Sequence, residues 1–254
     1  MIKIMKIYCR ENDCMLLLNH KKRKKLSKEM SGIMLDIVKG KLIVSCQALE
    51  DEPLHSSFIM GRMAKAAKEG GAVAIRAQGV EDIIEIKRVT NLPVIGLIKR
   101  NYDDSQIYIT ATKKEVDDLL SSGCEMIALD ATDRKRPNNE SLKDLISYIK
   151  SKNILVMADI SNYEEGIKAY EYGADCVSTT LSGYTEYTKK QEGPDFELMK
   201  KLVKDLPIPV IAEGRVNTPK DLVDSYNTGV YSAVVGSAIT RPQLITEKFV
   251  NAIL

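Results

Sequence analysis

The sequence predicts a closed (β/α)8 barrel, and three observations favour this fold. From about residue 40 onward, short apolar runs alternate with segments of helical periodicity, and the alternation occurs eight times. The runs are apolar throughout, as expected for parallel strands that are buried on both faces. Eight strand–helix units in roughly 215 residues also match the usual size of such a barrel. A doubly wound open sheet is the alternative, but eight even repeats favour closure.

The predicted strands share a short apolar body, and nearly every one ends in a polar or charged residue. They cover Leu42–Ser45, Ala72–Arg76, Val94–Lys99, Met126–Asp130, Leu155–Asp159, Cys176–Thr180, Pro209–Glu213 and Ser232–Gly236. Glycines stand just before four of these strands, at Gly70–Gly71, Gly123, Gly173 and Gly229. Glycine at such a place ends the preceding helix in the left-handed conformation.

The predicted helices carry their own start signals. They cover Phe58–Glu69, Val80–Val89, Thr112–Ser122, Ser141–Lys150, Tyr163–Tyr172, Phe196–Asp205, Pro219–Tyr226 and Pro242–Leu254. Thr112 and Glu115 have the spacing of a capping box. Asn162 and Asp195 are good helix starters, and Thr218 is followed by a proline that fits the first turn.

The composition excludes several classes of protein. The chain has 254 residues, 44% of them hydrophobic, and no apolar run reaches the length of a membrane span. Its five cysteines are scattered, which indicates reduced thiols in a cytoplasmic protein. The distant histidines His20 and His55, without any CxxC pair, argue against zinc. Neither GxGxxG nor GxxxxGK[ST] occurs. We therefore expect no metal and no cofactor.

The charge divides the chain into two parts. Residues 1–33 hold nine Lys/Arg and three Asp/Glu, a net charge of +6, so the other residues carry −4 to reach the total of +2. An acidic body argues against nucleic-acid binding. We expect residues 1–33 to be a disordered basic extension and 34–254 to be the barrel, with Met34 a true or usable start. The rival interpretation is a tail that docks on an anionic surface such as a membrane.

The strand ends together predict an active site, because barrel enzymes react at the carboxyl ends of their strands. In order, these ends supply Ser45/Gln47, Arg76, Lys99, Asp130, Asp159, Thr179/Thr180, Glu213 and Gly236. Alternate strands share a layer, so Lys99 and Glu213 are expected to face each other across the mouth. Burial and the nearby charge of Arg76 should lower the pKa of Lys99. A neutral amine can then act as a base.

The last two strands predict a phosphate site. Glu213-Gly214-Arg215 follows one strand, and Gly236-Ser237 follows the next and opens a helix. Backbone N–H groups at these two places often form a phosphate cradle in such barrels. Arg241 is placed to complete it with a bidentate contact.

Nine runs of residues resemble the N-acetylmannosamine-6-phosphate 2-epimerases of bacterial sialic-acid catabolism, from about Met34 to the C-terminus. The runs are Ile43–Ala48, Pro53–Ser57, Ala74–Gly79, Gly96–Arg100, Ala128–Thr132, Met157–Ser161, Ser178–Thr185, Glu213–Arg215 and Gly236–Pro242. The resemblance implies a metal-free barrel that often pairs as a homodimer through its C-terminal helix. Ser237, where some members have glycine, and residues 1–33 depart from the pattern.

The resemblance also implies roles for individual residues. Lys99 would move the C2 proton of the sugar, and Glu213 would assist. The remaining residues divide into those that hold the sugar, Gln47, Arg76 and Asp159, and those that surround the phosphate, Gly214, Arg215, Gly236, Ser237 and Arg241. These roles imply conversion of N-acetylmannosamine 6-phosphate to N-acetylglucosamine 6-phosphate. A Schiff-base phosphosugar aldolase and a non-catalytic phosphosugar-binding protein are the alternatives.

Overall fold

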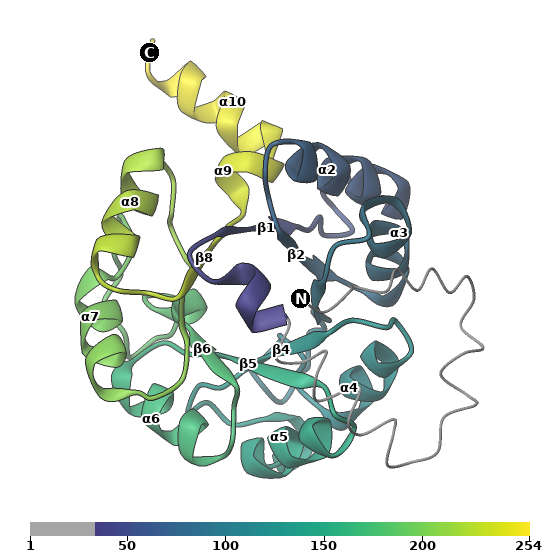
Figure 1. The fold of residues 1–254 in the computed structure, drawn as a ribbon, viewed down its shortest axis with the longest axis vertical. Coiled ribbons are helices and arrows are strands. Elements are labelled where there is room, and N and C mark those ends of the chain that lie inside the picture. Colours follow the sequence, from purple (N-terminus) through teal and green to yellow (C-terminus); the bar gives the residue numbers. More distant parts are fainter. Residues whose placement is uncertain (1–33) are drawn as a thin grey trace, which may run out of the picture.

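The computed structural model describes residues 34–254, which form a closed barrel of eight parallel strands in sequential order (Figure 1). The strands are β1 (Leu42–Cys46), β2 (Ala74–Gln78), β3 (Val94–Leu97), β4 (Met126–Asp130), β5 (Leu155–Asp159), β6 (Cys176–Ser178), β7 (Val210–Ala212) and β8 (Ser232–Val235). The pairing of β1 with β8 closes the ring. The predicted barrel is therefore confirmed, whereas the predicted extension at 1–33 lies outside the described residues.

The helices form a ring outside the strands (Figure 1). They are α2 (Ser57–Glu69), α3 (Val80–Thr90), α4 (Lys113–Leu120), α5 (Leu142–Ser151), α6 (Tyr163–Glu171), α7 (Phe196–Asp205), α8 (Pro219–Asn227), α9 (Ser237–Thr240) and α10 (Pro242–Asn251). The expected capping box of Thr112 and Glu115 opens α4. Asn162, Asp195 and Thr218 cap α6, α7 and α8 through their side chains.

Two layers of apolar side chains stabilise the barrel. One layer lies between the strands and the helices and includes Ile75, Ile127 and Leu202. The other fills the barrel interior and includes Ile95, Met126 and Ile211. A helical turn at residues 34–38 joins the interior layer through the buried Met34 and Val38. Because the strands bury both faces, their apolar runs lack polar alternation.

Four strands end earlier than predicted, among them β8, which ends at Val235, one residue before the predicted Gly236. β3 ends at Leu97, and Lys99 forms only an isolated antiparallel bridge with Ile109. The chain turns back on itself there, because Thr110 N donates to Ile98 O and Arg100 N donates to Tyr108 O. β6 ends at Ser178, where a 3-10 turn, η2 (Thr179–Leu181), begins, and β7 ends at Ala212. The residues predicted as strand ends therefore lie on loops just above the sheet.

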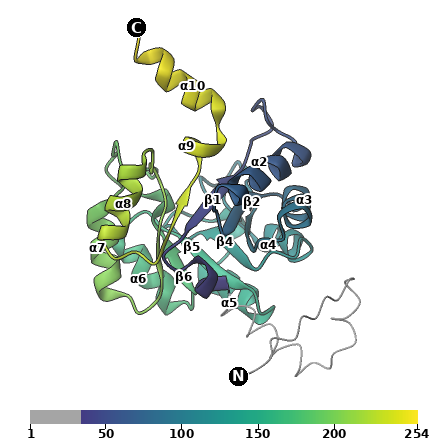
Figure 2. The same cartoon turned by 45° about the horizontal axis from the view of Figure 1, so that its top comes forward.

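Two helices follow β8: the short α9, and α10, which starts at Pro242 as predicted and ends at Asn251 rather than at Leu254. Arg241 separates α9 from α10 with a non-helical φ of −120° and ψ of 81°. The proline that follows disfavours helical backbone at the preceding residue. Figure 2 shows α10 projecting away from the barrel. Within residues 34–254, no helix is both long and apolar enough to cross a bilayer.

Candidate active site

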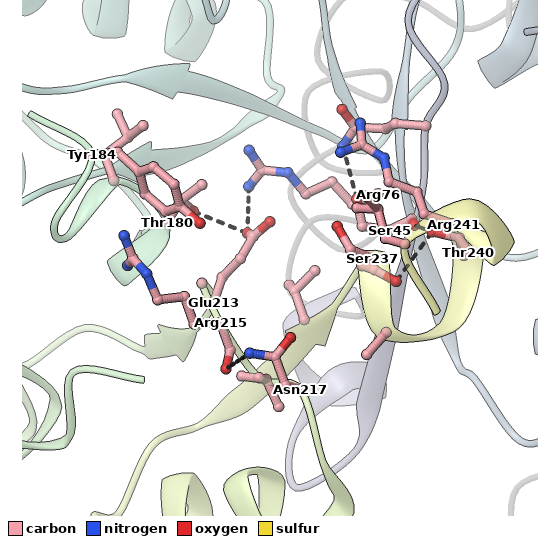
Figure 3. Close-up of a pocket in the computed structure, with 18 of the residues that line it drawn as sticks. Ser45, Arg76, Thr180, Tyr184, Glu213, Arg215, Asn217, Ser237, Thr240 and Arg241 are labelled. Atoms are coloured by element: carbon pink, nitrogen blue, oxygen red, sulfur yellow. Dashed lines mark hydrogen bonds and ion pairs between the residues drawn. The ribbon is translucent and has the colours of Figure 1, made fainter. Parts of the chain in front are cut away.

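A cavity of about 560 Å³ opens at the carboxyl ends of the strands. Nine of the ten predicted site residues line it, and they come from β2 and from the loops that follow β1, β3, β7 and β8. These residues are Gln47, Arg76, Lys99, Glu213, Gly214, Arg215, Gly236, Ser237 and Arg241. Figure 3 shows Arg76 and Glu213 between Arg215 on one side and Arg241 on the other. The tenth residue, Asp159, does not line the cavity.

Arg76 is the centre of a buried ion cluster. Its side chain extends from β2 and is only 1% exposed. Nη1 and Nη2 donate to both carboxylate oxygens of Asp159, at 2.9 and 2.6 Å. Nη1 also donates to Glu213 Oε2 at 2.7 Å. Asp159 therefore fixes the guanidinium from behind, and its predicted contact with the sugar stays a prediction.

Glu213 is held by one of its two carboxylate oxygens. Oε2 accepts from Arg76 and from Thr180 Oγ1 at 3.0 Å (Figure 3). It also accepts from Ser178 Oγ at 3.3 Å. Oε1 makes no hydrogen bond to the described residues. Burial raises the pKa of Glu213, and the charge of Arg76 opposes this rise. Glu213 thus presents one free oxygen and a raised proton affinity to the cavity.

Lys99 differs from these residues because its amine has no partner of opposite charge. No hydrogen bond or ion pair joins Nζ to any residue of 34–254. Burial lowers the pKa of Lys99 to about 8, and the positive charges of Arg76 and Arg241 act in the same direction. Glu213 and Glu52 oppose the shift. The lowered pKa agrees with the sequence prediction, and the structure adds Arg241 as a second cause.

Gln47 directly follows β1 and lines the same cavity as Lys99. Its Nε2 donates to Ser45 Oγ at 2.8 Å. Its Oε1 is buried and has no partner among the described residues. A buried amide oxygen without a partner is costly, so it is suited to accept a hydrogen bond from a bound molecule.

The first side of the predicted phosphate site follows β7. Gly214 and Arg215 both have positive φ values, 101° and 55°. This conformation turns the chain sharply and suits glycine at the first of the two positions. Arg215 donates to the carbonyls of Ser182 and Gly183, and its guanidinium stacks on Tyr184 at 4.0 Å. Arg215 is therefore held rigidly at the cavity wall.

The second side follows β8. Gly236 begins α9, whose first backbone N–H groups have no side-chain cap. Thr240 Oγ1 donates to Ser45 O at 2.8 Å and fixes α9 on β1. Arg241 follows directly and donates from Nη2 to Glu52 Oε2 at 2.9 Å. Uncapped N–H groups and two arginines make this end of the cavity suited to an anion.

Comparisons with known proteins show which family this chain is similar to. Residues 60–254 match the model of a family described as "Putative N-acetylmannosamine-6-phosphate epimerase". A Clostridioides difficile (strain 630) protein named "Putative N-acetylmannosamine-6-phosphate 2-epimerase" is 79% identical over 220 residues, which are 87% of this chain and 99% of that protein. The solved N-acetylmannosamine-6-phosphate 2-epimerase from Clostridium perfringens is 68% identical, with 87% of this chain and 96% of that chain covered and a TM-score of 0.85.

The chain belongs to the N-acetylmannosamine-6-phosphate epimerase family. The resemblance seen in the sequence is thereby confirmed. A thiamine phosphate pyrophosphorylase from Pyrococcus furiosus is 19% identical, covers 84% of this chain and 96% of its own, and has a TM-score of 0.54. That likeness concerns the fold alone.

Sequence reasoning missed several residues that line the cavity of this family member. Tyr108 lies on the segment that returns to Lys99, and burial and the charge of Asp130 raise the pKa of its hydroxyl. Asn217 follows β7, and Lys248 reaches the cavity from α10, where Nζ donates to Asn217 Oδ1 at 3.1 Å. Tyr108 and Lys248 are distant along the sequence from any strand end, so a search of the strand ends could not find them.

The three acids predicted at the strand ends, Asp130, Asp159 and Glu213, each accept hydrogen bonds from an arginine and from a hydroxyl group. Among residues 34–254, no group of three or more His, Cys, Asp or Glu side chains is arranged to hold a metal ion. Asp130, the other acid at the mouth, accepts from Arg134 Nη2 at 2.6 Å and from Thr132. It does not line the cavity of the family site.

Proposed function

We propose that this chain converts N-acetylmannosamine 6-phosphate to N-acetylglucosamine 6-phosphate by removing and returning the C2 proton. The observation that carries the proposal is the unpaired amine of Lys99, whose pKa of about 8 lies near neutrality, in a cavity with Arg76 and Glu213. A base is most effective when its pKa lies near the working pH. The named activities of the Clostridioides difficile and Clostridium perfringens relatives support the same reaction.

In the proposed mechanism, the sugar ring opens and exposes the C1 aldehyde, which acidifies the C2–H bond. Neutral Lys99 takes this proton, and the electron pair of the bond moves onto the carbonyl oxygen to form an enolate. Arg76 stabilises the negative charge. A proton from solvent then adds to the opposite face of C2, which inverts the configuration, and the ammonium of Lys99 releases its proton to solvent so that the neutral amine is restored.

Glu213 is proposed to move protons on the ring oxygen and the carbonyl oxygen. Its free Oε1 and its raised pKa support this role, because a carboxyl group must be able to give and to take a proton. Asp159 is proposed to keep Arg76 in place during both steps, through the paired bonds of 2.9 and 2.6 Å. The remaining N–H donors of Arg76 stay available to the substrate.

The phosphate of the substrate is proposed to bind between the loops after β7 and β8. Arg215 and Arg241 line opposite sides of this part of the cavity (Figure 3). Arg241 uses one N–H on Glu52, which leaves the others for phosphate oxygens. Backbone N–H groups of Gly214, Gly236 and Ser237 would complete the site. Gln47 is proposed to hold the sugar through its unpartnered Oε1.

The decisive test is proton NMR of N-acetylmannosamine 6-phosphate with the protein in D₂O. We expect N-acetylglucosamine 6-phosphate to appear, with deuterium at C2 in the product. Borohydride added with substrate distinguishes the aldolase alternative, because an aldolase leaves a trapped lysine adduct and an epimerase leaves none. Binding without turnover would favour a phosphosugar-binding protein and overturn the proposal.

We also propose that two copies pair through α10. None of the residues of α10 is buried, and Phe249, Ile253 and Leu254 are 74, 85 and 97% exposed. A projecting helix that exposes Phe249 and is followed by two further exposed apolar residues favours contact with another surface, and homodimers are the commonest soluble assembly (Figure 2). Analytical ultracentrifugation should give twice the mass of one chain, and Phe249→Glu should shift the species toward one chain.

We further propose that the enzyme works in the cytoplasm. The cysteines of the described residues, Cys46, Cys124 and Cys176, are buried free thiols, as is usual in proteins of reducing compartments. Fractionation of source cells followed by immunoblotting should find the protein with cytoplasmic markers.

A further inference from the structure

The carboxylate of Glu52 joins two parts of the chain at the edge of the phosphate site. Glu52 lies on the loop between β1 and α2, 189 residues before Arg241 in sequence. Oε2 accepts from Arg241 Nη2 at 2.9 Å, and Oε1 accepts from Gln243 Nε2 at 3.0 Å. Arg241 stands at the break between α9 and α10, and Gln243 lies in the first turn of α10. One carboxylate therefore holds both the break and the start of α10.

Glu52 is itself fixed by its own loop. Leu49 N donates to Oε2 at 2.7 Å, and Glu52 N donates back to Leu49 O at 2.9 Å. The side chains of Arg241 and Glu52 are 25% and 17% exposed, so solvent screens their attraction only in part. Glu52 therefore connects its own fixed loop to the chain between α9 and α10, where Arg241 interrupts the helical backbone.

The contact between Glu52 and Arg241 uses only one N–H of the guanidinium. Nε and Nη1 make no hydrogen bond to any residue within 34–254, and Arg241 lines the cavity whereas Glu52 does not. An arginine held on one edge can present its other edge to two oxygens of a phosphate. The geometry thus indicates that Glu52 supports the binding of phosphate by Arg241 and does not compete with the phosphate for the guanidinium.

The same loop carboxylate acts on the amine of Lys99. The charged groups that act on Lys99 are Arg76 and Arg241, which lower its pKa, and Glu213 and Glu52, which raise it. Removal of the negative charge of Glu52 leaves the two arginines less opposed. The pKa of Lys99 should then fall further.

We propose that Glu52 is a positioning residue of the epimerase, which holds Arg241 and the start of α10 against the cavity so that the guanidinium meets the substrate phosphate. This inference rests on the proposed function. It assigns to Glu52 no contact with the substrate itself, because the carboxylate lies behind Arg241.

The test compares Glu52→Gln with Asp51→Asn, which removes one charge from an exposed neighbour in the same loop. In Glu52→Gln, we expect KM for N-acetylmannosamine 6-phosphate to rise about tenfold, with little change in kcat at high pH. In a plot of kcat/KM against pH, the acidic limb, where the rate falls as Lys99 becomes protonated, should move to lower pH. Glu52→Asp keeps the charge, so it should raise KM without moving the limb. Asp51→Asn should match the wild type in both.

A second measurement does not depend on turnover. Calorimetric titration with inorganic phosphate should show weaker binding to Glu52→Gln than to the wild type and to Asp51→Asn. A lower KM in Glu52→Gln would mean that Glu52 competes with phosphate, and would overturn the inference. Equal constants in Glu52→Gln and Asp51→Asn would overturn it as well. A wild-type protein that binds phosphate but shows no turnover would instead contradict the proposed function.

Discussion

Asp130 and Asp159 end neighbouring strands in register, and both side chains are completely buried, yet they serve different parts of the mouth. Asp130 pairs with Arg134, four residues away, and its other partner is Thr132. Asp159 pairs with Arg76, which is 83 residues away and lines the cavity. The carboxylate of Asp130 therefore orders its own loop, whereas that of Asp159 orders a group of the active site. The role of a buried acid at a strand end therefore depends on where the arginine that pairs with it lies.

The largest effect is expected at Lys99, on the Asp159 side of the mouth. Lys99→Met keeps the length of the side chain and removes the base, so turnover should be lost while the melting temperature stays close to that of the wild type. Loss of a general base typically costs 10²–10⁴-fold. NMR in D₂O measures both product and C2 exchange. Activity near that of the wild type would refute the mechanism.

The comparison is tested directly by the matched pair Asp159→Asn and Asp130→Asn. Both variants leave a buried arginine less compensated, so both should lower the melting temperature. Only Asp159→Asn releases Arg76, and a small displacement of such a group can cost about 10²-fold in kcat/KM. Asp130→Asn should stay within about threefold of the wild type per folded molecule. Equal kinetic losses in the two variants would break the distinction.

A smaller effect is expected at the phosphate site. Arg241→Ala removes a charged hydrogen-bond donor to the substrate, so KM should rise roughly 10- to 100-fold with a lesser change in kcat. Unphosphorylated N-acetylmannosamine should be used equally poorly by the variant and the wild type. An unchanged KM for the phosphosugar would place the phosphate elsewhere.

The pH dependence sharpens the contrast between Lys99 and the paired charges. The amine of Lys99 must be neutral to accept a proton, and its pKa is about 8. The value of kcat/KM should therefore fall about tenfold for each pH unit below 8 and level off above it. A rate that is flat from pH 6 to 9 would exclude an amine of this pKa as the base.

The smallest effect is expected from residues 1–33, which we propose to contribute neither to the cavity nor to the barrel. A protein that begins at Met34 keeps the buried Met34 and Val38. Its kcat/KM and melting temperature should stay within error of the full chain, because the truncation removes no side chain of the described core or cavity. A clear fall of either quantity would show that the segment supports the barrel.

Much of the fold could be predicted from local patterns. Apolar runs at Leu155–Asp159 or Met126–Asp130, and caps such as Thr112, report the strand and helix starts directly because these signals act over a few residues. The barrel geometry then gathers strand ends at one rim, which explains why Gln47, Arg76 and Glu213 line one cavity.

The tertiary structure alone decided which charged groups pair and which stay free. The amine of Lys99 has no charged partner within residues 34–254, Asp159 pairs with Arg76, and Glu52 holds Arg241. Each of these relations joins residues that are distant along the chain or placed by an irregular loop. Helical and strand periods describe only near neighbours, whereas pairing and pKa depend on burial and distance in space.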